Sequence, residues 1–110
     1  MSDFEFDPDK DSDVILEDEE DVEIKKPSMY RVLIHNDPYT PREFVVLVLQ
    51  SVFHKSEEEG KKIMLVAHTK GLATVGIYTH EVAKTNIFLV EKMADEFGCP
   101  LRCTMEEVEI

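Results

Sequence analysis

The sequence predicts an α+β fold, a small two-layer sandwich in which three helices lie on one face of a three-stranded antiparallel sheet. Strand-like and helix-like apolar patterns follow one another in the order β-α-α-β-α-β between residues 30 and 106. Each predicted helix has recognisable start or stop residues, which fix its place in that order. The length of 110 residues is enough for one domain at most.

The acidic residues are concentrated at the N-terminus. Residues 1–25 contain twelve of the 24 acidic residues and only two lysines, a net charge of −10, so residues 26–110 carry −2 of the total of −12. Apolar residues are too sparse there to offset the entropy lost on folding. We expect residues 1–26 to be a disordered acidic extension and residues 27–110 to form the core domain. Composition leaves open whether the extension only solvates the protein or binds a partner.

The first strand and the first helix enclose a short polar turn. Residues 30–34 are apolar and β-branched, as in a strand, and residues 44–53 repeat apolar side chains at helical spacing. We expect Thr40 to be the N-cap of this helix, with Pro41 at the first helical position and Glu43 completing a capping box. The side chains expected to face inward are Phe44, Val45, Val48, Leu49, Val52 and Phe53.

The second helix and the second strand follow directly. Ser56 and Glu59 form a capping box, and Gly71 is a left-handed helix stop. Residues 72–79 then predict a strand, in which Gly76 indicates that another group packs close to the backbone. The side chains expected to face inward are Ile63, Met64 and Ala67 in the helix and Ala73, Val75 and Ile77 in the strand.

A third helix and a final strand complete the domain. The helix should begin near Thr79 or His80 and end at Gly98. Cys99 and Cys103 form no paired-cysteine motif, and Cys103 is at an inward position of the strand, so we expect a buried free thiol. The inward positions are Val82, Ala83, Ile87, Val90, Ala94 and Phe97 in the helix and Leu101, Cys103 and Met105 in the strand.

Several functional classes are not expected from this composition. The basic residues of the core domain are dispersed, which disfavours nucleic-acid binding. No apolar run approaches the roughly 20 residues that span a bilayer, and no signal peptide pattern is present, so we expect a cytoplasmic protein. No Gly-rich phosphate loop or HExxH motif occurs, and we expect no cofactor and no metal.

Asn36, Asp37 and His68 are the candidate functional residues. A carboxylate, an amide carbonyl and an imidazole nitrogen can each accept one N–H of a primary ammonium group, while an apolar hollow beside them takes the attached side chain. Ordinary turn chemistry for Asn36 and Asp37 and a capping role for His68 remain open. A catalytic pair of His68 and Asp37 is disfavoured because no nucleophile or complete metal site accompanies it, and we expect no enzyme.

Ordered segments over nearly the whole core domain resemble the ATP-dependent Clp protease adaptor family ClpS. They are Pro27-Ser-Met-Tyr30, His35-Asn-Asp-Pro-Tyr-Thr-Pro-Arg-Glu-Phe-Val-Val46, Ile63-Met-Leu-Val-Ala-His-Thr-Lys-Gly71, Val75-Gly-Ile-Tyr-Thr-His-Glu-Val-Ala83 and Pro100-Leu-Arg-Cys-Thr-Met-Glu106. The resemblance implies an adaptor that binds destabilising N-terminal residues (N-degrons) and delivers their proteins to a Clp ATPase.

The resemblance also implies roles for individual residues. Asn36, Asp37 and His68 would hold the α-ammonium group of the substrate, so an acetylated terminus should not bind. A pocket for the first side chain, which is Phe, Leu, Tyr or Trp in the family, would be lined by Ile34, Thr40, Arg42, Val45, Met64, Ala67 and Leu101.

The chain departs from the family pattern at several positions. Arg42 replaces a frequent methionine and Ala67 a frequent valine, so we expect Phe, Tyr and Trp termini to gain relative to Leu. Pro38 removes a frequent acidic residue from the rim. Glu81 of the family's chaperone-docking motif is kept, whereas Lys84 and Asn86 change its charges.

The implied partners are the N-terminal domain of a ClpA-like AAA+ unfoldase and N-degron proteins, and we expect a monomer. The acidic extension would be the segment that the unfoldase pulls during transfer. The alternative is a plain protein-interaction domain, because the C-terminal domain of the ribosomal stalk protein is similar in fold and fold does not fix function.

Overall fold

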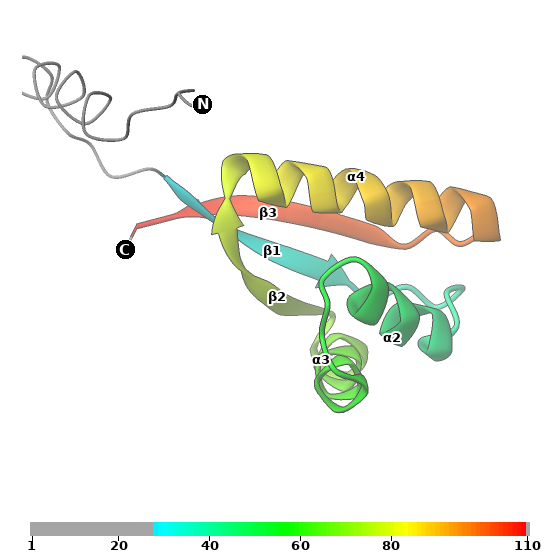
Figure 1. Ribbon diagram of the computed structural model, residues 1–110. Coiled ribbons are helices and arrows are strands. Elements are labelled where there is room, and N and C mark those ends of the chain that lie inside the picture. Colours follow the sequence, from blue (N-terminus) through cyan, green and yellow to red (C-terminus); the bar gives the residue numbers. More distant parts are fainter. Residues whose placement is uncertain (1–27, 110) are drawn as a thin grey trace, which may run out of the picture.

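The structure, a computed structural model, describes residues 28–109. The elements are β1 (Met29–His35), α2 (Arg42–Ser51), α3 (Glu57–Lys70), β2 (Leu72–Thr79), α4 (His80–Phe97) and β3 (Arg102–Val108) (Figure 1). This order and the single three-stranded sheet confirm the predicted α+β fold. The acidic extension predicted for residues 1–26 lies outside the described residues, so its disorder stays a prediction.

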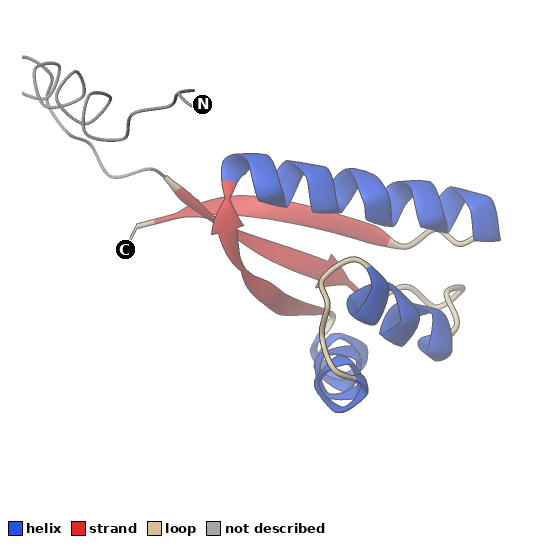
Figure 2. Cartoon of the chain, viewed as in Figure 1, coloured by secondary structure: helices blue, strands red, loops and turns tan. Residues whose placement is uncertain are grey.

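The central strand of the sheet is β1, which pairs antiparallel with β2 on one side and β3 on the other. His35 pairs with Leu72 and Arg102, while Met29 pairs with Thr79 and Val108. The end of β1 therefore coincides with the start of both neighbouring strands. Helix α4 runs along the sheet, and α2 and α3 lie together where β1 ends (Figures 1 and 2).

An irregularity in the pairing of β1 with β2 changes which residues of β2 face the core. Val32 pairs with Gly76 but Leu33 with Thr74, so Val75 is an extra residue on β2. The extra residue shifts the alternation by one position and turns Ile77 away from the core, which leaves that side chain 46% exposed. The predicted inward position of Ile77 is therefore wrong.

In the part of β2 that follows this irregularity, Gly76 and Tyr78 face the core. A Cβ atom on Gly76 would lie 2.7 Å from the Tyr78 hydroxyl oxygen. The Tyr78 ring also packs against Phe53, with 6.0 Å between ring centroids. The close approach to the backbone predicted at Gly76 is confirmed, and the neighbouring group is a side chain of the same strand.

The core lies between the sheet and the helices. Val32 and Ile34 of β1 are fully buried and share a cluster with residues of every helix and strand. Predicted inward positions at Val82 and Phe97 are exposed, although the Phe97 ring keeps a contact with Phe44 at 5.1 Å between centroids. The other buried apolar residues are Phe44, Val46, Val48, Leu49, Val52, Phe53, Ala67, Ala73, Val75, Ala83, Val90, Ala94, Leu101 and Cys103.

The ends of two helices follow the predicted capping chemistry. The Ser56 hydroxyl accepts from the Glu59 backbone N–H at 3.1 Å, and α3 ends at Gly71, whose φ of 97° is left-handed. Thr79 caps α4 in the same way, accepting from the Val82 backbone N–H at 3.4 Å, and Gly98 ends that helix.

The predicted cap of the first helix is wrong. Helix α2 begins at Arg42, and its N-cap is Pro41, which makes no side-chain cap bond. The Thr40 hydroxyl instead donates to the Asp37 carboxylate, with 2.7 Å between the oxygens. Thr40 therefore stabilises the turn before the helix and leaves the backbone N–H groups of the first helical turn to other partners.

Close packing joins α2 to α3. Gly60 of α3 is buried, and a Cβ atom there would lie 3.3 Å from Val46 Cγ1 of α2. The helix pair can approach this closely because Gly60 has no side chain. This contact fixes α3, and with it His68, beside the start of α2.

Candidate functional site

The turn after β1 brings the predicted acceptor residues together. The Asn36 backbone N–H donates to the Gly71 carbonyl oxygen at 2.8 Å, which ties the turn to the end of α3. His68 lies in the last turn of the same helix. One backbone bond therefore places Asn36 and Asp37 beside a residue more than thirty positions later in the chain.

A cavity of about 390 Å³ opens between this turn, α2 and α3. Its volume is in the range of small-ligand sites. All three predicted ammonium acceptors line it, as do six of the seven predicted pocket residues. The lining residues are Ile34, His35, Asn36, Asp37, Pro38, Thr40, Pro41, Arg42, Val45, Met64, Ala67 and His68.

The seventh predicted pocket residue, Leu101, does not line the cavity. It is only 4% exposed and belongs to the hydrophobic core just before β3. The contribution of Leu101 to the pocket therefore stays a prediction. Sequence reasoning also left His35 and Pro41 out of the pocket, although both are chain neighbours of predicted site residues.

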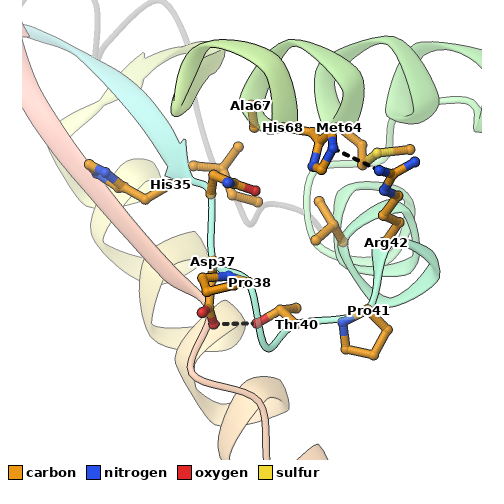
Figure 3. Close-up of a pocket in the computed structure, with 12 residues that line it drawn as sticks. His35, Asp37, Pro38, Thr40, Pro41, Arg42, Met64, Ala67 and His68 are labelled. Carbon is orange, nitrogen blue, oxygen red and sulfur yellow. Dashed lines mark hydrogen bonds between the residues drawn. The ribbon is translucent and has the colours of Figure 1, made fainter.

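The Asp37 carboxylate is held in a fixed orientation by its own turn. Oδ1 accepts from the Tyr39 backbone N–H at 3.1 Å and Oδ2 accepts from the Thr40 hydroxyl at 2.7 Å. Figure 3 shows Asp37 turned toward Thr40. Each oxygen still has accepting capacity for a ligand, because a carboxylate offers about four lone-pair positions.

His68 has a partner that the sequence did not reveal. The Arg42 guanidinium donates from Nη2 to His68 Nε2 at 2.7 Å, and Figure 3 shows the two side chains, from α2 and α3, meeting at one side of the cavity. Arginine has no acceptor atom, so Nε2 is the acceptor and the ring proton is on Nδ1. The acceptor nitrogen expected to meet a ligand is therefore already occupied by Arg42.

The geometry does not assemble the catalytic pair considered from the sequence. His68 contacts Arg42, whereas Asp37 contacts Thr40 and Tyr39. No serine or cysteine is among the residues that line the cavity. Within residues 28–109 there is also no group of three His, Cys, Asp or Glu residues that could hold a metal ion.

The buried thiol of Cys103 lies outside this site. Cys103 is buried in β3, and both cysteines are free, as predicted. Burial raises the pKa of the Cys103 thiol to about 12, and the negative charge of Glu91 contributes in the same direction. The thiol is therefore protonated at neutral pH and is a poor nucleophile.

The predicted chaperone-docking residues lie on α4. Glu81 and Lys84 are exposed and three residues apart, so they share one face of the helix. Asn86 is half-buried and two residues beyond Lys84, which places it on a different side. The three residues therefore do not form one continuous patch.

Comparison with known proteins decides the family. The family model described as ATP-dependent Clp protease adaptor protein ClpS matches residues 25–104. The chain belongs to the ClpS family of Clp protease adaptors. This confirms the resemblance seen in the sequence, and an adaptor family is consistent with a protein that is not itself an enzyme.

Proteins named ATP-dependent Clp protease adapter protein ClpS are similar over most of their length. The protein from Oleidesulfovibrio alaskensis is 48% identical over 108 residues, covering 98% of this chain and 100% of that protein. The protein from Myxococcus xanthus is 50% identical over 99 residues, covering 90% of this chain and 92% of that protein. The similarity therefore extends over at least 90% of this chain in both comparisons.

A solved ClpS structure has the same fold. Agrobacterium tumefaciens ClpS2, described as bound to L-phenylalaninamide, superposes with a TM-score of 0.73 and 40% sequence identity. The match covers 76% of this chain and 100% of that one. Across the described part of the present chain, no helix is long and apolar enough to cross a membrane.

Proposed function

We propose that this chain is a cytoplasmic adaptor that binds proteins through a bulky apolar N-terminal residue and delivers them to a Clp ATPase for degradation. The observation that carries the proposal is a cavity lined both by apolar side chains and by the acceptors Asn36, Asp37 and His68. A ligand with a free ammonium group and a large apolar side chain fits both halves of the site, the acceptors and the apolar pocket. L-phenylalaninamide, the ligand of the Agrobacterium ClpS2 structure, has this chemistry.

The two halves of the site contribute to affinity in different ways. Ile34, Val45 and Met64 offer the first side chain an apolar environment, and burying a large apolar group is worth about 1.5–3 kcal/mol. Hydrogen bonds to a charged group add about 1.5–3 kcal/mol each. Both contributions are needed for tight binding, so neither a free amine alone nor an apolar side chain alone should bind well.

Selectivity among N-terminal residues should depend on two of the departures from the family pattern, Arg42 and Ala67. Ala67 leaves more room than the frequent valine, and the Arg42 guanidinium can stack on an aromatic ring at the opening. We therefore expect peptides that begin with Phe, Tyr or Trp to gain affinity relative to a Leu peptide. Tighter or equal binding of the Leu peptide would contradict this.

The binding proposal is tested by fluorescence anisotropy with a labelled peptide that begins with Phe. Saturable binding should weaken at least tenfold when the amine is acetylated, because the ammonium hydrogen bonds are lost. Asp37→Ala should have a similar effect, whereas Asp95→Ala, which removes an exposed carboxylate from α4, should have none. Binding that ignores acetylation would favour the alternative of a plain interaction domain.

Delivery is tested separately by degradation of a reporter that begins with Phe. Glu81 and Lys84 on the exposed face of α4 are proposed to contact the N-terminal domain of the unfoldase. Deleting residues 1–20 should leave peptide binding unchanged and abolish degradation if the acidic extension is the segment that the unfoldase pulls. Unchanged degradation by the truncated protein would exclude that role.

A further inference from the structure

Within residues 28–109, the Arg42 guanidinium at the mouth of the cavity has no anionic partner. Its hydrogen bond goes to His68 Nε2, an uncharged acceptor, at 2.7 Å. Only two ion pairs occur within residues 28–109, Arg31 with Glu106 and Lys61 with Glu57, and neither includes Arg42. The side chain is exposed, so its positive charge is available to a ligand.

The positive charge of Arg42 lies where the proposed ligand would place its ammonium group, which is a second positive charge. The inference here rests on the proposed function, in which His68 accepts one N–H of the ligand ammonium. Arg42 already donates to the same imidazole, and two cations side by side repel each other. A ligand that carries only an ammonium group must therefore displace Arg42 from His68 without offering it a new partner.

A carboxylate next to the ammonium group removes this conflict. The planar guanidinium has five N–H donors and binds carboxylates with two parallel hydrogen bonds, which an imidazole cannot offer. Arg42 also lines a second hollow of about 560 Å³ between α2 and α3, where Met64 again forms part of the wall. Arg42 therefore lines both hollows, and because Glu43 and Glu57 line the second, the ligand carboxylate is expected on the cavity side of the guanidinium.

We propose that Arg42 is a carboxylate-binding residue that extends ligand specificity to groups carrying a negative charge beside the α-ammonium. Two kinds of ligand have this chemistry: a protein with Asp or Glu as its second residue, and a free bulky apolar amino acid with its own α-carboxylate. In both, the carboxylate takes Arg42 away from His68 as the ammonium arrives. A basic second residue has the opposite effect and weakens binding.

The proposal is tested by calorimetric titration with two matched pairs of ligands. One pair is L-phenylalanine and L-phenylalaninamide, and the other is a Phe-Asp and a Phe-Asn peptide of otherwise equal sequence. The carboxylate member of at least one pair should bind the unaltered protein about tenfold more tightly than its neutral partner. Preference in the amino acid pair identifies a free amino acid ligand, and preference in the peptide pair identifies an acidic second residue.

Arg42→Met, which keeps much of the stem and removes the charge, should abolish that preference, so that the two members of each pair bind the variant equally. Arg31→Met, at an arginine that pairs with Glu106 on the sheet, is the matched control and should leave the preference unchanged. Equal binding of both members of each pair by the unaltered protein would overturn the proposal, as would a preference that survives Arg42→Met. If the N-degron function itself is wrong, neither L-phenylalaninamide nor any of the peptides binds either protein, which is a distinct result.

Discussion

Replacing Thr40 with valine should destabilise the domain because it removes a hydrogen bond to the Asp37 carboxylate. Thr40 is only 9% exposed, and its hydroxyl donates to Asp37 Oδ2 at 2.7 Å. Valine has nearly the same shape, so the change removes the hydrogen bond without opening a cavity. A hydrogen bond to a charged group is worth about 1.5–3 kcal/mol. We expect a loss of about 2 kcal/mol, or a fall in Tm of about 8–16 °C for a domain of this size.

The single substitution does not by itself identify the partner of Thr40. Loss of a helix N-cap costs about 0.5–2 kcal/mol, which overlaps the expected value. A double-mutant cycle with Asp37→Ala separates the two roles, because only a direct bond makes the effects non-additive. We expect Thr40→Val to cost at least 1 kcal/mol less when Asp37 is already alanine.

Urea unfolding followed by far-UV circular dichroism is the suitable assay, since the chain has no tryptophan. Thr85→Val, at an exposed position of α4, is the control and should change stability by about 0.5 kcal/mol or less. Additive effects of Thr40→Val and Asp37→Ala, within about 0.3 kcal/mol, would refute the assignment of Thr40 to Asp37.

Three further predictions concern the core and the helix ends. Leu49→Ala should reduce the free energy of unfolding, measured by urea titration, by about 2–5 kcal/mol because Leu49 is fully buried. The control Leu47→Ala, at an exposed position of the same helix, should reduce it far less. Gly98→Ala should lower stability by about 1 kcal/mol, since its φ of 71° strains any residue with a Cβ atom. The Cys103 thiol has a pKa of about 12 in the folded protein against 9.0 as its ordinary value, so the folded state should lose stability as pH rises from 9.0 toward 12. Cys103→Ala should flatten that pH dependence, and native alkylation at pH 8 followed by mass spectrometry should modify Cys99 before Cys103.

The elements of the fold could be predicted because local residues determine their ends. Ser56, Thr79 and the two left-handed glycines act within one helical turn, so their sequence patterns are sufficient. The orientation of Ile77 could not be predicted in this way. It depends on an extra residue in the pairing of β2 with β1, and that register is set by a strand about 40 residues earlier in the chain.

In the candidate site, too, features set by local residues could be predicted and features set by long-range packing could not. Asn36, Asp37 and His68 line one cavity, as expected from residue types that can accept hydrogen bonds from an ammonium group. The bond between Arg42 and His68 depends on the packing of α2 against α3 and on two side-chain conformations, so nothing in the local sequence indicates it. Leu101 was assigned to the pocket by resemblance; it belongs to the buried cluster just before β3, and its role in the pocket stays a prediction.

The central strand β1 separates the cavity from the start of α4. His35 ends it beside the cavity, whereas Met29 pairs with Thr79, the residue that caps α4 at the opposite end of the sheet (Figure 1). At about 3.3 Å per residue, the strand separates these ends by roughly 20 Å. The cavity and the first turn of α4 therefore lie at opposite ends of the central strand and share no residue.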